Sequence, residues 1–248
     1  MEWFKSNNMK ANANKFQLMY ISRNGQIENE TLNLGDELIN SSKSINVLGV
    51  EIDRQLKFNL HIDEICGQTG KQVNALKRIR HYLDKKCKMI IYNSYINSNF
   101  NYCSPIWFFT NKSNMDKLER TNKRALRFAT NKESVSYENI CKDENQLSVL
   151  RKCVKSIAIL IFKARKGNAP SYVNELFTLH ESQYEMRDNE KLILPNYNTV
   201  GYGKNSMRYY GAKLWNNIPT SIKNCSSLNT FKSAVNKWLL TCEDNKIY

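Results

Sequence analysis

Carboxylates and histidines are the side chains of this sequence whose chemistry could support catalysis or metal binding. Phosphoryl transfer with two metal ions needs carboxylates close together, because the ions lie about 4 Å apart. Pairs of adjacent acidic residues occur at Asp36-Glu37, Asp143-Glu144 and Glu243-Asp244, and each pair is next to a turn or a terminus. Capping and solvation account for such pairs without a metal. The histidines, His61, His81 and His180, are far apart and form no HxxxH or HxH spacing. The residues therefore predict no catalytic site, no metal site and no cofactor.

Basic residues give a more definite pattern, because they recur at helical spacing. Positions three or four apart lie on one face of a helix. The longer strip of cations consists of Lys117, Arg120, Arg124 and Arg127. A shorter strip consists of Lys71, Asn74 and Arg78, with Lys77 and Arg80 next to it. Such rows suit the phosphates of a nucleic-acid backbone and predict salt-sensitive binding that is indifferent to sequence, with a solvated helix face as the alternative.

The positive charge is concentrated in the middle of the chain. The net charge is +14 over 248 residues. Residues 1–58 hold seven Lys/Arg and seven Asp/Glu, residues 59–166 hold twenty-one and nine, and residues 167–248 hold nine and seven. The middle segment alone thus carries +12. A localised positive field favours a polyanionic partner, and nucleic acid is favoured over a membrane because no lipid-inserting face accompanies the charge.

The composition is that of an ordinary globular protein, with 41% hydrophobic and 24% charged residues. The longest apolar run, Ile157–Phe162, is too short to span a bilayer, and residues 1–20 do not resemble a secretory signal. The seven cysteines include no CxxC spacing, which predicts reduced thiols in an intracellular protein, in the nucleus or the cytoplasm. The oligomeric state stays open.

The first part of the chain, residues 1–58, predicts short strands after a brief helix at Trp3–Ala13. Aromatic and branched residues between turn signals are typical of strands. The expected strands are Phe16–Ser22, Gln26–Leu34, Glu37–Asn40 and Ile45–Ile52, with turns at Asn24-Gly25 and Gly35-Asp36. A sheet this small leaves an apolar face uncovered, so we expect this part to be the least stable.

Helical periodicity begins at Asn59 and continues to the C-terminus. The expected helices cover Asn59–Ile79, a stretch capped by Asp84, a stretch from Ser113 to Ala129, Ser136–Lys142, Leu147–Lys166 ended by Gly167, a helix begun by Pro170, Ser206–Asn216 and Leu228–Leu240. Ser104 before Pro105 predicts that the chain changes direction there. Residues 178–204 are polar and predict an irregular connection. The predicted fold class is α+β: a small antiparallel sheet, then a basic helical domain over 59–130 and a helical region over 131–248.

Several motifs, in order, resemble the C-terminal part of non-LTR retrotransposon reverse transcriptases of the jockey-like or LINE type. They are LGVEID at 48–53 with Leu56 and His61-Ile62, NYCSPIW at 101–107, RALR at 124–127, GAKLWNNIP at 211–219 and Phe231-Lys232. Each is weak alone, and their order and spacing make the match specific. With Trp3, Asn12 and Lys15, the resemblance runs from about Trp3 to Leu240.

The resemblance implies the end of the palm, the thumb and the C-terminal region of an RNA-directed DNA polymerase. Lys15 would correspond to the palm lysine near the outgoing pyrophosphate, although Phe16 replaces the family's Thr or Ser beside it. Leu48 and Gly49 would belong to the hairpin that grips the primer, and the basic helices would form the thumb. The family's paired aspartates, which hold Mg²⁺, would precede Met1, and no Asp-Asp occurs here. We therefore expect a truncated chain that does not polymerise alone.

Three hypotheses follow. The first is an inert reverse-transcriptase remnant that still binds RNA–DNA or duplex nucleic acid through its thumb helices. The second is a co-opted helical module without nucleic-acid function, which binds a protein through the aromatic residues Trp215, Phe231 and Trp238. The third is a polymerase whose acidic residues come from another chain, and it is the least favoured.

Overall fold

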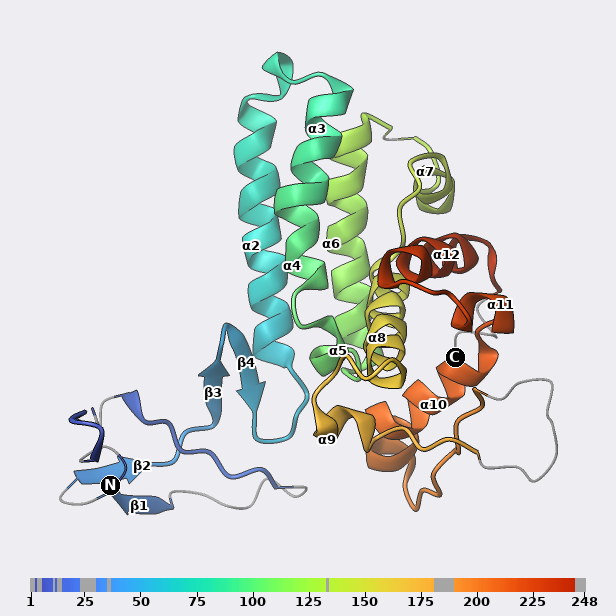
Figure 1. The fold of residues 1–248 in the computed structure, drawn as a ribbon. Helices are drawn as coiled ribbons and strands as arrows, with labels where there is room; N and C mark the ends of the chain where they lie inside the picture. The colour runs from blue at the N-terminus through green and yellow to red at the C-terminus, as the bar shows by residue number, and fades with distance from the viewer. Residues whose placement is uncertain are drawn as a thin grey trace. The chain divides into compact units, whose positions relative to one another are not determined.

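The structure is a computed structural model that describes residues 3, 6–10, 12, 15–22, 30–34, 37–132, 134–180 and 190–243. The chain divides into two compact units, Met1–Glu64 and Ile65–Tyr248. Two small antiparallel sheets lie in the first unit, and helices make up the second (Figure 1). The α+β fold class predicted from the sequence is therefore confirmed. The predicted boundaries at residues 58 and 130 stay predictions.

The first sheet pairs β1 (Thr31–Leu34) with β2 (Glu37–Asn40) in antiparallel register. The strand expected at Phe16–Ser22 is wrong: its residues form no ladder in the described part and make a single parallel bridge from Leu18 to Ser41. The Leu18 carbonyl accepts hydrogen bonds from the Ser42 backbone N–H at 2.8 Å and from its hydroxyl at 3.2 Å. The segment at Ser42 thus supplies the hydrogen-bond donors for the Leu18 carbonyl. The Asn24-Gly25 and Gly35-Asp36 turns lie outside the described residues.

The second sheet is a hairpin of β3 (Ser44–Val47) and β4 (Val50–Asp53), where the apolar pattern predicted one strand over Ile45–Ile52. That prediction is wrong because the chain reverses at Leu48 and Gly49, whose φ angles are 50° and 80°. Two successive residues at positive φ make the two-residue turn whose twist matches antiparallel strands. The Asn46 side chain accepts a hydrogen bond from the Gly49 N–H at 3.0 Å.

The loop after β4 is held by one carboxylate. Asp53 accepts hydrogen bonds from the backbone N–H groups of Gln55, Lys57 and Phe58 at 3.0, 3.1 and 2.5 Å. These bonds stabilise a segment in which Leu56 and Phe58 have positive φ, a conformation unfavourable for residues with a side chain. The LGVEID motif and Leu56 therefore have a structural role: they fold a hairpin and a tight loop ahead of the first long helix.

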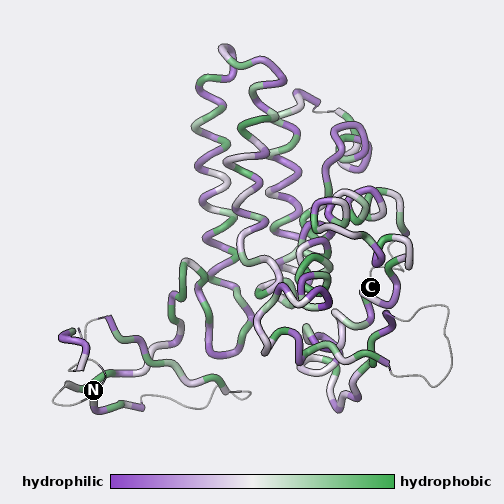
Figure 2. The backbone as a smooth tube through the Cα atoms, in the orientation of Figure 1, coloured by the Kyte–Doolittle hydropathy of each residue, from purple (hydrophilic) through white to green (hydrophobic). Residues whose placement is uncertain are grey.

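The first part of the helical unit contains two long helices, α2 (Asn59–Arg78) and α6 (Lys112–Thr130), which lie beside the run from α3 (Lys85–Ile91) to α4 (Asn97–Asn101) (Figure 1), and short helices that connect them. Its other elements are η2 (Arg80–Tyr82), the π-helical η3 (Tyr92–Ile96) and α5 (Ser104–Trp107). Asn99 of α4 donates hydrogen bonds to Thr69 and Gln72 of α2 at 3.1 and 2.7 Å. Hydrophilic and hydrophobic stretches alternate along α2 and α6 (Figure 2), as expected for helices with one buried face.

The helix boundaries follow local capping. Asp84 accepts a hydrogen bond from the Cys87 N–H at 2.6 Å, so the predicted cap of α3 is confirmed. The chain turns at Cys103, with φ of 48°, and Ser104 already begins α5, so the reversal predicted at Ser104 comes one residue earlier. Asn111, not Ser113, caps α6, because its side chain accepts from the Asn114 N–H at 2.8 Å.

The second part of the helical unit surrounds α8 (Val149–Arg165). Its other elements are α7 (Tyr137–Asp143), α9 (Ser171–Asn174), the π-helical η4 (Val200–Lys204), α10 (Met207–Asn217), α11 (Thr220–Lys223) and α12 (Leu228–Thr241). α8 contacts α4, α5, α6, α9, α10 and α12, which makes it the centre of the core. Gly167, with φ of 69°, follows its end, and Pro170 precedes α9 as the cap rather than beginning the helix.

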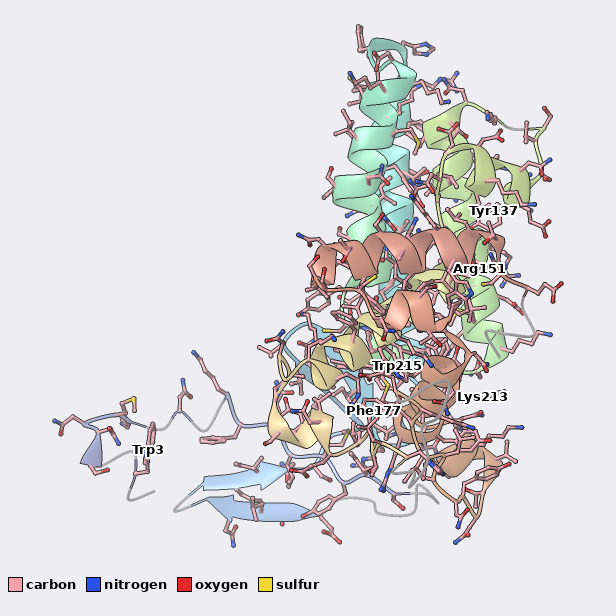
Figure 3. All side chains as sticks on the ribbon, turned by 45° about the vertical axis from the view of Figure 1, so that its right-hand side comes forward. Trp3, Tyr137, Arg151, Phe177, Lys213 and Trp215 are labelled. Carbon is pink, nitrogen blue, oxygen red and sulfur yellow. The ribbon has the colours of Figure 1, made fainter. Side chains whose placement is uncertain are left out.

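Two of the three aromatic residues proposed as a partner surface belong to this core. Trp215 is 1% exposed and Phe231 is 0% exposed. The Phe231 ring stacks on Phe162 with centroids 4.1 Å apart and lies 6.1 Å from Trp215. Figure 3 labels Trp215 on α10 among the surrounding side chains. The cluster therefore stabilises the packing of α8, α10 and α12.

Candidate nucleic-acid interface

A groove of about 540 Å³ opens beside α6 in the helical unit. Six of its lining residues are cationic and none of the described lining residues is acidic. The lining consists of Lys77, Arg80, Arg120, Lys123, Arg124, Arg127, Phe128 and Asn131. We call this feature the basic groove.

One wall of the basic groove is a single face of α6. Its cations, at positions 120, 123, 124 and 127, follow the spacing that places side chains on one side of a helix. Leu118, Ala125 and Leu126 are buried on the opposite side, each 0% exposed. Burial of that apolar face fixes the rotation of α6 and so directs the cationic face outward.

The other wall comes from the end of α2 and the start of η2, through Lys77 and Arg80. A hydrogen bond joins α6 to α2: the Arg124 guanidinium donates to the Asn74 side chain at 3.0 Å. Two segments about forty residues apart in sequence thus place cations around one hollow.

The cations of the basic groove have no carboxylate partners among the described residues. Ion pairs in this unit form elsewhere: Lys85 lies 2.7 Å from Glu144, and Lys132 lies 2.7 Å from Asp143 and 3.5 Å from Glu144. The hydrogen bond with Asp143 raises the pKa of Lys132. The acidic pair at 143–144 therefore neutralises neighbouring lysines and leaves the groove positive.

Arg127 is the most constrained cation of the groove. Its Nη2 donates to the Val135 carbonyl at 3.3 Å, while its buried Nε has no hydrogen-bond partner in the structure. Nearby, Lys88 donates to the Asn131 side chain at 2.9 Å and lies 5.8 Å from the centre of the Phe128 ring. A planar guanidinium held on one side is well suited to present its remaining donors to a phosphate.

The structure brings together some of the cations predicted as a binding strip. Arg120, Arg124 and Arg127 line the basic groove, whereas Lys117 lies outside it. Lys71 and Arg78 are exposed on α2 and also lie outside it. The sequence strip missed Lys123, although its spacing of three and four from Arg120 and Arg127 was the available signal. Lys77 and Arg80 were noted only as neighbours, because their place in the groove depends on tertiary packing.

The remaining residues to which the resemblance gives a role, Leu48, Gly49 and Lys15, lie in the first unit. Leu48, 86% exposed, and Gly49 form the tip of the β3–β4 hairpin. Lys15 is exposed, and its backbone N–H donates to the Asn12 carbonyl at 3.0 Å. Their assignments as primer grip and palm lysine stay predictions.

Within the described residues, no group of three His, Cys, Asp or Glu side chains lies close enough to hold a metal ion. A further adjacent acidic pair, Asp63 and Glu64, lies exposed near the start of α2. Burial lowers the pKa of neighbouring His61. No described helix is long and apolar enough to cross a membrane, and none of the seven cysteines, all described, forms a disulfide.

A second set of ionisable groups is buried beneath α6 and α8. Lys152, which is buried, donates to the Tyr92 hydroxyl at 3.0 Å and to Asn122 at 3.4 Å. Tyr92 donates to Asn122 at 2.6 Å, Asn122 donates to Tyr137 at 2.6 Å, and Tyr137 donates to Glu119 at 3.1 Å. Burial lowers the pKa of Lys152 to about 8, and the charge of Glu119 opposes part of that shift. We call these five residues the Lys152 cluster.

Comparison of the chain with protein-family models, with curated proteins and with solved structures found no match. The functional argument therefore depends on the chain's own geometry and on the motifs quoted above.

Proposed function

We propose that the helical unit binds the backbone of nucleic acid through the basic groove, without sequence preference. The observation that carries this proposal is the convergence of six cations from α2, η2 and α6 on one hollow that no described carboxylate lines. Like charges so close together repel one another, and phosphates would relieve that repulsion. A polyanion with regularly spaced charges fits such a site better than a small anion does.

The chemistry of the groove favours phosphate contacts over contacts with base edges. Four of the six cations are arginines, whose guanidinium groups present paired donors to phosphate oxygens. Contacts of this kind fix the position of a nucleic acid but do not read its sequence.

As part of the same proposal, the chain is the C-terminal part of a non-LTR retrotransposon reverse transcriptase, and the basic helices are its thumb. The RALR motif supports this assignment, because Arg124 and Arg127 line the groove while Ala125 and Leu126 lie in the core. The resemblance favours an RNA–DNA hybrid or another duplex as ligand. The family's polymerase chemistry uses Mg²⁺ held by paired aspartates, and no Asp-Asp occurs in this sequence. We propose that this chain alone binds and does not polymerise.

The proposal is tested by the salt dependence of binding to a labelled RNA–DNA hybrid. Each phosphate contact contributes roughly 0.9 to the slope of log affinity against log salt for a duplex. We expect the double variant Arg120→Gln/Arg124→Gln to lower the slope by about 2 and the affinity about tenfold or more at low salt. Fluorescence anisotropy over a series of salt concentrations measures both quantities.

The matched control removes the same charge elsewhere. Lys191 and Lys237 are exposed and lie outside the groove, so Lys191→Gln/Lys237→Gln lowers the net charge equally. We expect that control to change the slope by less than about half a unit. Equal losses in the two double variants would show that total charge, not the groove, drives binding.

A further inference from the structure

A second hollow, of about 660 Å³, lies elsewhere in the helical unit and differs in character from the basic groove. It is formed by the segment between α5 and α6, the start of α6, the start of α8 and the segment from η4 to α10. Aromatic rings and lysines share its lining, including Phe109, Tyr209, Tyr210, Lys112, Lys204 and Lys213. We call it the aromatic pocket.

The rings of the aromatic pocket are held in fixed positions by one another. Phe108, which is 8% exposed, lies 5.0 Å from Phe109 and 4.9 Å from Tyr210, measured between ring centres. Phe109 and Tyr210 meet edge to face at 5.9 Å. Both are half-buried, so each keeps part of its surface open while its neighbours restrain it. Restrained rings offer a flat apolar ligand a surface that loses little entropy on binding.

One wall of the pocket is an unusual segment, the π-helical η4. A side chain at Gly203 would meet Tyr197, since a Cβ there would lie 2.6 Å from the Tyr197 Cβ. Tyr197 in turn packs edge to face against Tyr209 at 4.9 Å. The Ser206 hydroxyl donates to the Gly203 carbonyl at 2.6 Å and caps α10. These contacts fix the backbone that carries Lys204. π-helical turns occur frequently at functional sites.

Positive charge reaches the aromatic pocket from three elements. Lys112 begins α6, Lys204 ends η4, and Lys213 lies in the middle of α10. Lys213 and the core residue Trp215 are two positions apart on α10, and Figure 3 labels both. Asp116 is the one carboxylate among the described lining residues, so the cations outnumber it. The N-terminal end of α6 adds a partial positive charge in the same place.

A ligand that suits this pocket has a flat aromatic part and an anionic part. The volume of the pocket lies within the range of small-molecule sites, about 300–1,000 Å³. An apolar ligand would not use the positive charge of Lys204, and a simple anion would leave the rings uncovered. A nucleotide satisfies both, because its base stacks on aromatic rings and its phosphate pairs with ammonium groups.

We propose that the aromatic pocket binds one unpaired nucleotide, with its base against Phe109 and Tyr210 and its phosphate near Lys204. This site is separate from the basic groove and does not depend on the groove's function. The nucleotide is either free or part of a single strand. Stacking on an aromatic ring accepts any base, so the site selects unpaired over paired nucleotides rather than one sequence over another.

The experiment uses the full chain and three fluorescent probes: a labelled mononucleotide, a five-nucleotide single strand and a blunt duplex. We expect Lys204→Gln and Phe109→Leu each to weaken binding of the single strand about fivefold or more, because each removes one of the two recognition contacts. Binding of the duplex should change less than about twofold in both variants. If Lys204→Gln and Phe109→Leu lower the affinities for the mononucleotide and the single strand by equal factors, a free nucleotide is a sufficient ligand. If the single strand binds and the mononucleotide does not, the ligand is a nucleotide within a strand.

Two further variants keep the pocket and the groove distinguishable. Lys237→Gln removes an exposed charge outside both sites and should leave all three affinities unchanged. Arg120→Gln/Arg124→Gln should weaken the duplex more than the single strand. If the duplex does not lose more affinity than the single strand in this double variant, the proposal for the basic groove is contradicted. The proposal for the aromatic pocket is tested separately, by the affinity for the single strand.

Lys204 is exposed, so its variant reports on binding even if Phe109→Leu lowers the amount of folded protein. Ultraviolet cross-linking of the bound single strand should label Phe109, Tyr209 or Tyr210. The proposal is overturned if neither the mononucleotide nor the single strand binds, if Lys204→Gln and Phe109→Leu leave their affinities unchanged, or if the cross-links map only to α2 and the exposed face of α6.

Discussion

The basic groove and the Lys152 cluster place positive charge in opposite environments within one helical unit. In the groove, six cations face a hollow without a described carboxylate partner. In the cluster, a single ammonium group is enclosed, and two hydroxyls, an amide and Glu119 form a hydrogen-bonded chain with it. Both sites draw on α6: its outer face lines the groove, and Asn122 and Glu119 extend to the cluster.

The difference separates two uses of lysine and arginine. A buried cation must have its hydrogen bonds satisfied inside the protein, because an unsatisfied one is strongly destabilising. Exposed cations without partners contribute little to folding and repel one another. The cluster should therefore affect stability and not ligand binding, whereas the groove should affect ligand binding and not stability. The following predictions test that contrast.

The largest effect is expected where the cluster is densest. Asn122 is 0% exposed and bonds to Tyr92, Tyr137 and Lys152. The change Asn122→Ala leaves buried polar groups without their partner, which should lower the free energy of unfolding by about 3 kcal/mol and the melting temperature by about 5–10 °C. Thermal and urea unfolding measure both.

The matched control for this prediction is an exposed asparagine. Asn229 lies exposed in α12, and we expect Asn229→Ala to change the free energy of unfolding by less than about 0.5 kcal/mol. Affinity for the RNA–DNA hybrid, measured below the melting temperature, should be the same in Asn122→Ala and the native protein. A stability loss under about 1 kcal/mol in Asn122→Ala would mean that the cluster does not stabilise the fold.

The second effect is a pH dependence. Burial lowers the pKa of Lys152 to about 8 from 10.5, so between these values the folded state binds fewer protons than the unfolded state. Stability then rises with pH through that window, because the enclosed charge is lost. Between pH 7 and pH 9.5 the gain should be about 2 kcal/mol.

Other buried groups also contribute to the pH dependence of stability, so the effect of Lys152 is measured as a difference. Burial raises the pKa of Cys153, Cys141, Tyr92 and Tyr137, and these groups lower stability as pH rises. They are present equally in Lys152→Met, which has no ammonium group. Urea unfolding at pH 7 and pH 9.5 should show that the free energy of unfolding of the native protein increases with pH relative to that of this variant. A difference that does not vary with pH would exclude a lowered pKa at Lys152.

Apolar periodicity in the sequence predicted most of the helices. α2, α6, α8, α10 and α12 bury residues at steps of three and four, so the pattern and the packing agree. The apolar pattern missed the β3–β4 turn because Leu48 is apolar and sits inside an apolar run, where its residue type does not indicate a positive φ. The resemblance, by contrast, implied a hairpin at Leu48 and Gly49. Phe16–Ser22 has a strand-like composition, but strand formation also needs a partner strand.

The candidate sites were predictable only where they belong to one element. The cationic face of α6 follows from spacing, since burial of Leu118 and Ala125 fixes its direction. The wall made by Lys77 and Arg80 depends on where α2 ends beside α6, and no local sequence pattern predicts that placement. Lys152 is one of twenty-one Lys/Arg in residues 59–166 and has no local mark of burial. Long-range packing decides which cations are structural and which are exposed.

The third effect is expected at the solvent-side end of the cluster. Tyr137, labelled in Figure 3, is half-buried, accepts from Asn122 and donates to Glu119. The change Tyr137→Phe removes one hydroxyl and keeps the ring, so the expected loss of unfolding free energy is about 1 kcal/mol. In Asn122→Ala the same substitution should have a smaller effect, because the bond between the two residues is already absent. Additive losses in the double variant would show that the two residues act independently.

The smallest effect on stability is expected in the basic groove. Arg124 is exposed and donates one hydrogen bond, to Asn74, while Arg120, Lys123 and Arg127 surround it. Arg124→Gln keeps a donor near Asn74 and removes one of several repelling charges, so the free energy of unfolding should change by less than about 0.5 kcal/mol in either direction. Added RNA–DNA hybrid should raise the melting temperature of the native protein more than that of the variant, since a ligand stabilises in proportion to its affinity. Arg124→Gln could instead lower the free energy of unfolding as much as Asn122→Ala does, while the hybrid raises the melting temperatures of variant and native protein equally. Arg124 would then stabilise the fold, and the contrast between groove and cluster would be contradicted.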